Sequence, residues 1–448
     1  MRVGRTWIIA ALLAVMVGAA LAETPAEKDA RMKWWDEARF GLFVTWGLYA
    51  IPAGIWEDGR VCRNEYGEWI ASDLAIPYSQ YARLASRWSP AKWDPESLIR
   101  MAAEAGMKYL VFTTKFHDGF SMFDTKASDW SVVKSTPWAK DSFRGLADAA
   151  RKYGLKLMPY YSILDWRHPD YDPRAPFNDL AAGHPDLDRY LVFLKAQLTE
   201  LQTNYGPLAG IWFDGNWSKT WTEARGRDLD AFVRRLIPGA VVNNRVGPPK
   251  DGVNGIVQGD FSTPEEKIPA NGLPGLRWES CMTMNETWGY RKDDLKWKNP
   301  VTLIRMLIDC ASKGGNFLVN VGPTAEGEIP GPSLLALREF AAWMKVNAAA
   351  IYGTQAGPFP KTPSWGRVTR KGDALYLHVF DWPADGIMVL PLSNSARAAR
   401  ILGRPGAQVK FEREPTGLKL VLPKIDLDPS ATVIELILDG APALIPAK

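Results

Sequence analysis

The stretch from Leu208 to Gly215, LAGIWFDG, carries the residue whose position is most suggestive of chemistry. Its apolar residues lead directly to Asp214 and then to a glycine, which is how a buried parallel strand ends when its last side chain serves a site rather than the core. An Asp-Gly pair after an apolar run can equally be an ordinary turn. Similar strand ends elsewhere in the chain favour the first interpretation, and we take Asp214 as the candidate nucleophile.

The other candidate strands also end in aromatic, histidine and carboxylate residues. In chain order these ends comprise Thr45-Trp46, Lys115-Phe116-His117-Asp118, Tyr160-Tyr161 with Asp165-Trp166-Arg167-His168, Trp212 with Asp214, Asn244-Arg245, Glu265-Glu266, Glu279 and Trp288. Residues just past the C-terminal ends of barrel strands face the active site. Such a rim is suited to binding sugars on aromatic faces and cleaving them between two carboxylates.

Two other chemistries would need different patterns. His117 and His168 lie near Asp118 and Asp165, but their spacing matches no metal-binding motif such as H-E-x-x-H, and four histidines are few for a His-based site. A Ser-His-Asp hydrolase would carry G-x-S-x-G, which the sequence lacks. Paired carboxylates fit best, because glycosidic cleavage needs a nucleophile and a general acid on opposite sides of one bond.

These residues need a scaffold, and the chain alternates β-rich runs with helical patterns. The candidate strands are 40–46, 109–116, 156–163, 208–214, 240–244, 277–283 and 316–321. Apolar residues at three- and four-residue spacing predict helices over 94–105, 143–153, 187–205, 228–236, 302–313 and 332–349. Repeated strand-then-helix units predict a parallel sheet with right-handed crossovers.

The length of 448 residues suits a barrel followed by a smaller domain. We expect a (β/α)8-like TIM barrel over residues 23–352, irregular on its later side because only seven of its eight strands are recognisable. A doubly wound sheet is the alternative, but no G-x-G-x-x-G follows the first strand. After a linker rich in Gly and Pro at 353–362, short β-rich runs predict an antiparallel β-sandwich over 363–448, which we expect to support the barrel.

The N-terminal segment predicts export. Residues 1–22 place Arg2 and Arg5 before a short apolar run that ends in A-L-A, the pattern of a secretory signal peptide cleaved after Ala22. A periplasmic or extracellular location follows, with no later segment apolar enough to span a membrane. The net charge of +4 is spread without a basic run, so nothing indicates nucleic acid, and three cysteines allow at most one disulfide.

Several longer strings of this chain occur in one order in a known family. On them the chain resembles the family 29 glycoside hydrolases, the α-L-fucosidases, over nearly all of the exported part. The strings are RMKWWDEARFGLFVTWGLYAIPAGIW, KFHDGF, YYSILDW, GIWFDG, VVNNR, GDFSTPEEKIP, WESCMTMNETWGY and KGGNFLVNVGPT. The resemblance implies a (β/α) barrel with a C-terminal β-sandwich, and a retaining exo-hydrolase of fucosylated oligosaccharides or glycans that uses neither a metal nor an organic cofactor.

The resemblance also implies roles for single residues. Asp214 in WFDG falls on the family's nucleophile, and Arg245 in NNR falls on its sugar-binding arginine. Trp212 lies beside the nucleophile, and His117 looks like the pocket histidine of the HDG motif. The positions that resemble wall residues of the sugar pocket are Tyr160 or Tyr161, Trp56 and Trp288.

Three carboxylates are candidates for the general acid. Glu265 in STPEEKIP is our prediction, and Glu266 is the neighbour that a shift of one position would select. Glu279 in RWES is the third candidate. A carboxylate inside a strand could instead hold Arg277 or a backbone donor by a hydrogen bond.

Two positions depart from the family pattern. Thr45 in TWG stands where the family has the His of HWG, and Ile55 in AGIW stands where it often has the Glu of AGEW. By resemblance both side chains would bind sugar hydroxyls, and a site that loses such a partner can lose several orders of magnitude in discrimination. We therefore expect an altered specificity, with sulfated fucose near Arg60 and Arg63 as one candidate.

A second hypothesis, from another class, is a carbohydrate-binding protein of the same fold that has lost turnover but kept the pocket. An α-L-glycosidase for a sugar other than plain fucose is a further alternative. The presence of Asp214 and of a carboxylate at Glu265 favours an enzyme.

Overall fold

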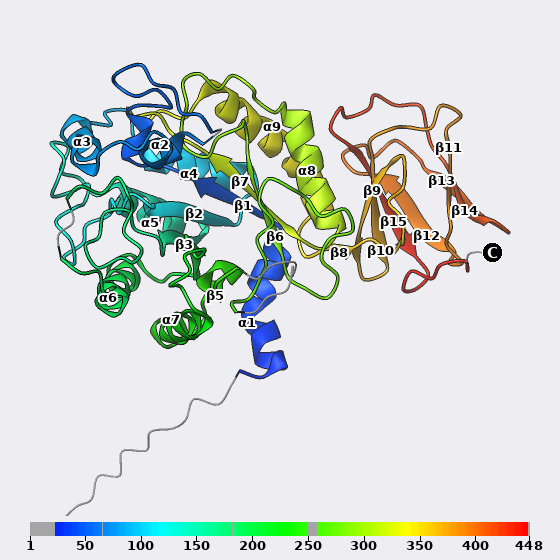
Figure 1. Ribbon diagram of the computed structural model, residues 1–448. Coiled ribbons are helices and arrows are strands. Elements are labelled where there is room, and N and C mark those ends of the chain that lie inside the picture. Colours follow the sequence, from blue (N-terminus) through cyan, green and yellow to red (C-terminus); the bar gives the residue numbers. More distant parts are fainter. Residues whose placement is uncertain (1–22, 65, 181–182, 250–257, 447–448) are drawn as a thin grey trace, which may run out of the picture.

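A computed structural model describes residues 23–64, 66–180, 183–249 and 258–446. Figure 1 shows a parallel sheet that curls on itself inside a layer of helices, with a separate β domain beside it at the C-terminus. The seven parallel strands lie in the order β5-β4-β3-β2-β1-β7-β6. The prediction of a barrel-like α/β domain followed by an antiparallel β domain is therefore confirmed.

Each of the seven predicted strands is present. Their bounds are β1 Phe40–Val44, β2 Tyr109–Lys115, β3 Lys156–Ser162, β4 Gly210–Asp214, β5 Val241–Val242, β6 Glu279–Thr283 and β7 Asn316–Val321. Almost every residue in them is buried, because helices cover the outer face of the sheet and side chains fill its interior.

The six predicted helices are also present, and the barrel has three that were not predicted. The predicted ones are α4 Pro95–Glu104, α5 Ser142–Tyr153, α6 Leu187–Tyr205, α7 Glu223–Leu236, α8 Pro300–Ser312 and α9 Gly331–Asn347; the others are α1 Pro25–Ala38, α2 Ile70–Asp73 and α3 Tyr78–Tyr81. Side chains cap most of the longer helices. Thr24 and Glu27 form a capping box at α1, and Asp141 accepts two backbone hydrogen bonds at the start of α5.

An irregular segment fills the place of the eighth strand. Between β5 and β6, residues 260–266 form parallel bridges to both sides, from Phe261 to Asn243 and from Glu265 to Cys281. Backbone hydrogen bonds join the segment to each neighbour, such as 2.8 Å from Asn244 N to the Phe261 carbonyl. The ring is thus closed by a chain segment whose pairing is too sparse to count as a strand, on the side where irregularity was predicted.

The C-terminal domain consists of two antiparallel sheets that share an apolar core. The larger has the order β12-β15-β10-β9-β8 and the smaller β11-β14-β13. Their bounds are β8 Gln355–Ala356, β9 Gly366–Lys371, β10 Ala374–Val379, β11 Ile387–Leu390, β12 Ala396–Ile401, β13 Lys410–Glu414, β14 Gly417–Val421 and β15 Thr432–Leu438. Because β8 pairs with β9, the predicted linker at 353–362 already contains a strand of this domain. The larger sheet packs on α8 of the barrel.

The cysteines and the helices can be compared with the sequence predictions. Cys62, Cys281 and Cys310 are all buried as free thiols. Within the described ranges, no helix has both the length and the apolar character that crossing a bilayer requires. The predicted signal peptide at 1–22 lies outside the described residues.

Candidate active site

A cavity of about 340 Å³ opens at the C-terminal ends of the barrel strands. Its lining combines aromatic rings with carboxylates, one histidine and one arginine, which is the composition expected of a sugar pocket. The lining residues are Phe43, Thr45, Tyr66, Glu68, Trp69, Thr113, Phe116, His117, Tyr160, Trp212, Asp214, Trp217, Arg245, Glu265, Cys281 and Trp288.

Asp214 is the last residue of β4, and its side chain is 12% exposed. Gly215 follows it with φ +75°, and a Cβ there would lie 2.5 Å from Leu164, so the turn after the aspartate requires glycine. Burial opposes the negative charge of Asp214, but the charge of Arg245 and the hydrogen bonds from Arg245 and Tyr160 outweigh it. The pKa of Asp214 is therefore lowered, and the carboxylate is ionised, as a nucleophile must be.

Arg245 connects the two carboxylates of the pocket. It lies in a short 3-10 turn, Asn244–Val246, directly after β5. Its Nη1 donates to Asp214 Oδ1 at 2.7 Å, and its Nη2 donates to Glu265 Oε2 at 2.6 Å. The guanidinium also lies over the ring of Trp212, 4.8 Å from the ring centre. One rigid fork thus fixes Asp214 and Glu265 on either side of a single cation.

The structure distinguishes the three candidate acids by where their side chains point. Glu265 lines the pocket, and its side chain is 37% exposed. Glu266 has φ +50° and accepts a 2.6 Å hydrogen bond from the backbone of Thr283, away from the cavity lining. Glu279 is fully buried and accepts hydrogen bonds from Tyr109 and from Trp212 Nε1. Only Glu265 can therefore reach a bound substrate.

Burial gives His117 and Glu279 pKa values far from their usual ones. It raises the pKa of Glu279 to about 7, although two hydrogen bonds oppose the shift. It lowers the pKa of His117 to about 4, with Asp214 acting in the other direction. His117 is accordingly neutral near pH 7, and its 3.7 Å approach to Asp214 is not an ion pair there.

The tautomer of His117 follows from its neighbour. Nδ1 lies 2.6 Å from Ser162 Oγ, and that hydroxyl already donates to the carbonyl of Leu164. Nδ1 must then carry the proton, which leaves Nε2 as a hydrogen-bond acceptor beside Asp214. An acceptor at this point can accept a hydrogen bond from a sugar hydroxyl.

The sequence-predicted wall residues are divided between the pocket and its surroundings. Thr45, Tyr160, Trp212 and Trp288 line the cavity. Tyr161 does not: its hydroxyl donates to Gln197 on α6, behind the sheet. Trp56 is buried outside the lining as well, and the wall expected from it is formed by Trp69.

Glu68 is an acidic pocket residue that was not predicted from the sequence, as Trp69 and Trp217 were not. It is 2% exposed, lines the cavity, and accepts a 2.8 Å hydrogen bond from Gly289 N. Burial raises its pKa to about 7, and the backbone hydrogen bonds offset only part of that rise. The signal was present: the string GEW at 67–69 repeats the family's Gly-Glu-Trp, displaced along the chain from AGIW at 53–56.

The expectation that Ile55 leaves this wall without a carboxylate was therefore wrong. Ile55 belongs to a hairpin in which it bridges Val61, and it is not part of the cavity lining. The string GEW at 67–69 places Glu68 and Trp69 in the cavity lining, whereas no residue of AGIW at 53–56 belongs to it. Two nearby arginines are engaged elsewhere, Arg60 with Asp58 and Arg63 with Asp73, which removes the basis for a sulfate site beside Ile55.

Thr45 lines the pocket as predicted, but its hydroxyl proton is already used in a hydrogen bond within the protein. Oγ1 donates to Asn320 Oδ1 at 2.7 Å, and Asn320 in turn donates to the carbonyl of Trp288. Thr45 can thus offer a sugar only an acceptor oxygen. Phe43 and Phe116 make the neighbouring lining apolar.

Trp217 marks the mouth of the cavity. It is 44% exposed, follows the nucleophile by three residues, and lies nearly parallel to Trp69 with 6.0 Å between ring centres. An exposed indole at the rim of a sugar pocket is a platform for the part of a substrate that extends outward.

Known proteins are similar to this chain over about nine-tenths of its length. A family model described as alpha-L-fucosidase matches residues 19–349. Tissue alpha-L-fucosidase of Bos taurus is 30% identical over 422 residues, covering 90% of this chain and 86% of its own.

Two solved structures extend the comparison to the fold. Alpha-L-fucosidase isoenzyme 1 from Paenibacillus thiaminolyticus superposes with a TM-score of 0.82 at 39% identity, over 92% of this chain and 99% of its own. A GH29 alpha-L-fucosidase from Bacteroides thetaiotaomicron, solved as a trapped covalent intermediate with 2-fluoro-fucosyl fluoride, superposes with a TM-score of 0.82 at 30% identity, over 92% of this chain and 97% of its own.

Proposed function

The chain belongs to the α-L-fucosidase family, glycoside hydrolase family 29, and we propose that its retaining hydrolysis of α-L-fucosides uses Asp214 as the nucleophile and Glu265 as the general acid and base. One observation carries the assignment of both residues: the guanidinium of Arg245 holds the two carboxylates around the same cavity. Retaining glycosidases keep their carboxyl groups about 5–5.5 Å apart, and a shared arginine fork supports a separation of this order.

In the first step an Asp214 carboxylate oxygen attacks the anomeric carbon of the fucosyl unit. The bond from that carbon to the leaving oxygen breaks, and the leaving oxygen takes a proton from Glu265. A fucosyl ester of Asp214 and a free alcohol result. The lowered pKa of Asp214 and the position of Glu265 on the open side of the cavity support these roles.

In the second step Glu265, now ionised, removes a proton from water. The water oxygen bonds to the anomeric carbon, and the bond to Asp214 breaks, so fucose leaves with its original configuration and both carboxyl groups return to their starting state. The covalent intermediate trapped in the Bacteroides thetaiotaomicron structure supports the same route for a relative.

Recognition of the sugar rests on Glu68 and His117. Glu68 presents a buried carboxyl group and His117 an acceptor nitrogen, and each suits a sugar hydroxyl. Among the described residues no Lys or Arg pairs with Glu68, so a sulfate ester on this wall would meet an acidic group without a compensating cation, which is unfavourable. We therefore propose unmodified α-L-fucose as the sugar, with Thr45 tuning recognition of one further hydroxyl.

The decisive experiment is hydrolysis of an aryl α-L-fucoside followed by nuclear magnetic resonance of the first-formed sugar. We expect turnover and initial release of α-L-fucose. A pocket that binds fucose but releases no product would favour the carbohydrate-binding alternative, and initial release of the β anomer would exclude the double displacement.

We also propose that the substrate is a fucosylated glycan met outside the cytoplasm. The charged start, apolar run and A-L-A end of residues 1–22 support export. Mass spectrometry of the protein from the periplasm or medium of an expressing bacterium should find an N-terminus at Glu23. Intact Met1 on protein retained in the cytoplasm would contradict export.

A further inference from the structure

The general acid lies on the part of the barrel wall where strand pairing is least regular. Glu265 lies on the irregular segment 260–266, which is joined to β5 and β6 by isolated bridges rather than by a continuous ladder. The position of its carboxyl group therefore depends on what holds this segment between its neighbours. The first helix of the chain, α1, lies beside this part of the wall (Figure 1).

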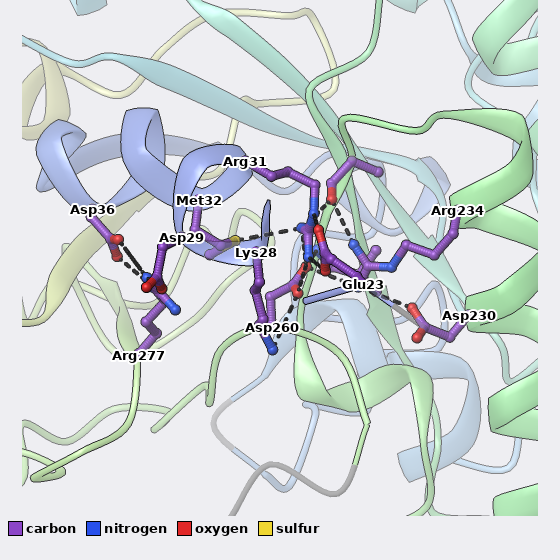
Figure 2. Close-up of polar contacts among 12 residues, drawn as sticks. Glu23, Lys28, Asp29, Arg31, Met32, Asp36, Asp230, Arg234, Asp260 and Arg277 are labelled. Atoms are coloured by element: carbon purple, nitrogen blue, oxygen red, sulfur yellow. Dashed lines mark hydrogen bonds and ion pairs between the residues drawn. The ribbon is translucent and has the colours of Figure 1, made fainter. Parts of the chain in front are cut away.

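Asp260 fixes the start of the segment. Its carboxylate is 1% exposed and accepts hydrogen bonds from Arg31 of α1, at 2.8 and 2.9 Å, and from the backbone of Val242 in β5. Arg234 of α7 pairs with it at 2.9 Å, and Lys28 approaches within 3.6 Å. Figure 2 shows these side chains converging on Asp260 from two helices.

The arginines are themselves held in place. Both donate to the carbonyl of Ala240, just before β5, and Glu23 binds Arg31 through both carboxylate oxygens. Burial opposes the charge of Asp260, but the arginines outweigh it and lower its pKa. The cluster is thus ionised and directional, and it ties the segment to β5, α1 and α7.

Helix α1 also forms ion pairs on the β6 side of the segment. Arg277, just before β6, donates to Asp36 and Asp29 of α1, as Figure 2 shows. The carbonyl of Arg277 accepts from Ser262 N at 2.9 Å. Between these two sets of ion pairs, Trp35 of α1 packs on Phe261 with 4.6 Å between ring centres. Helix α1 therefore contacts the segment, strand β5 and the residues just before β6.

We propose that α1 and the Asp260 ion cluster act as a brace that positions Glu265 for proton transfer. This proposal rests on the assignment of Glu265 as the general acid. Asp260, Arg31 and Arg234 do not line the cavity and are positioning residues. A proton must be delivered over hydrogen-bond distance to the leaving oxygen, so a small shift of the segment impairs protonation while leaving attack by Asp214, held on β4, intact.

The test compares substrates that differ in their need for an acid. Asp260→Asn keeps the size of the side chain but removes the charge that both arginines share. We expect kcat/KM to fall at least about tenfold more for phenyl α-L-fucoside, a poor leaving group, than for 2,4-dinitrophenyl α-L-fucoside, which departs without a proton. Glu265→Ala, measured in parallel, should show the same dependence more strongly.

Asp230→Asn is the matched control. Asp230 also pairs with Arg234, at 3.2 Å, but it lies on α7 and acts on Asp260 only through its charge. Its variant should keep the wild-type ratio between the two substrates. Equal losses on both substrates in Asp260→Asn, whatever its melting temperature, would show a purely structural role and overturn the brace.

Two further outcomes are separated by the same data. If Asp260→Asn does not fold, Arg234→Gln, which removes one of the two arginines at a partly exposed position, decides the question by the same ratio. If Glu265→Ala shows no leaving-group dependence, the acid has been misassigned and the brace falls with it. A dependence in Glu265→Ala alone refutes only the brace.

Discussion

Tyr160 donates a 2.8 Å hydrogen bond to Oδ2 of Asp214, the carboxylate oxygen that does not contact Arg245. Both oxygens of the nucleophile are therefore held by donors. Hydrogen bonds of this kind favour the charged form and fix the direction of the lone pairs. The carboxylate is ready for attack without a change of side-chain position.

Asp214→Gly should abolish the covalent route. We expect kcat to fall by several powers of ten with the fold retained, because the lost group acts in the reaction and glycine is tolerated at a strand end. Added azide should restore turnover by attacking from the vacated side, giving β-L-fucosyl azide. Near-normal activity without azide would end the assignment.

The three neighbouring carboxylates should separate by leaving group. Glu265→Ala should lose about 10²–10⁴-fold on substrates that need protonation and far less on activated aryl fucosides. Glu266→Ala and Glu279→Ala serve as controls, since their side chains bind Thr283 and Trp212 instead of facing the cavity. The assignment is wrong if either control shows the dependence and Glu265→Ala does not.

Glu68→Gln should be more stable than the wild type near pH 7 but less active. The pKa of Glu68 is raised from 4.5 to about 7. Between these pH values the folded protein keeps the Glu68 proton while the unfolded chain loses it. The free energy of unfolding therefore falls by about 3 kcal/mol as pH rises from 4.5 to 7. The variant lacks this loss. Its melting temperature relative to wild type should rise across that window and then level off.

Above pH 7, where Glu68 is mostly ionised, the same variant should lose about 10–100-fold in kcat/KM because a sugar hydroxyl loses a charged partner. Glu57→Gln is the control. Glu57 lies in the hairpin that contains Ile55, is exposed, and pairs with Arg87. A melting-temperature difference independent of pH would mean that Glu68 is not the titrating group.

Thr45→His and Ile55→Glu test which departure from the family pattern affects specificity. Thr45 lines the cavity and Ile55 does not. Thr45→His should change kcat/KM on aryl α-L-fucoside about tenfold or more, since it exchanges a committed hydroxyl for an imidazole. Ile55→Glu should leave the kinetics unchanged; a large effect there would restore the original sequence interpretation.

Trp217→Ala tests the platform at the cavity mouth. Loss of stacking should raise KM for a fucosylated disaccharide about 2–10-fold. Hydrolysis of α-L-fucosyl fluoride, whose leaving group is a single atom, should be unchanged. Equal effects on both substrates would place Trp217 in the fucose site instead.

Much of this molecule could be predicted from sequence because the relevant rules are local. Strand and helix positions follow from hydrophobic periodicity, and barrel geometry sends every strand end to one face, so Asp214, His117 and Arg245 could be placed at a common site from their order in the chain. The glycine after the nucleophile is also a local signal, because it marks the turn that ends the strand.

Other features depended on the tertiary structure. Glu265 and Glu266 are adjacent in sequence, and only the left-handed backbone at Glu266, with its hydrogen bond to Thr283, turns one toward β6 and leaves the other at the cavity. Glu68 lies on the cavity wall, whereas Ile55, the position that the family pattern pointed to, does not. Residues 260–266 close the ring because α1, β5 and β6 hold them there. The contacts made by α1 join residues more than two hundred positions apart, so they are fixed by packing and charge in three dimensions rather than by any periodicity of the sequence.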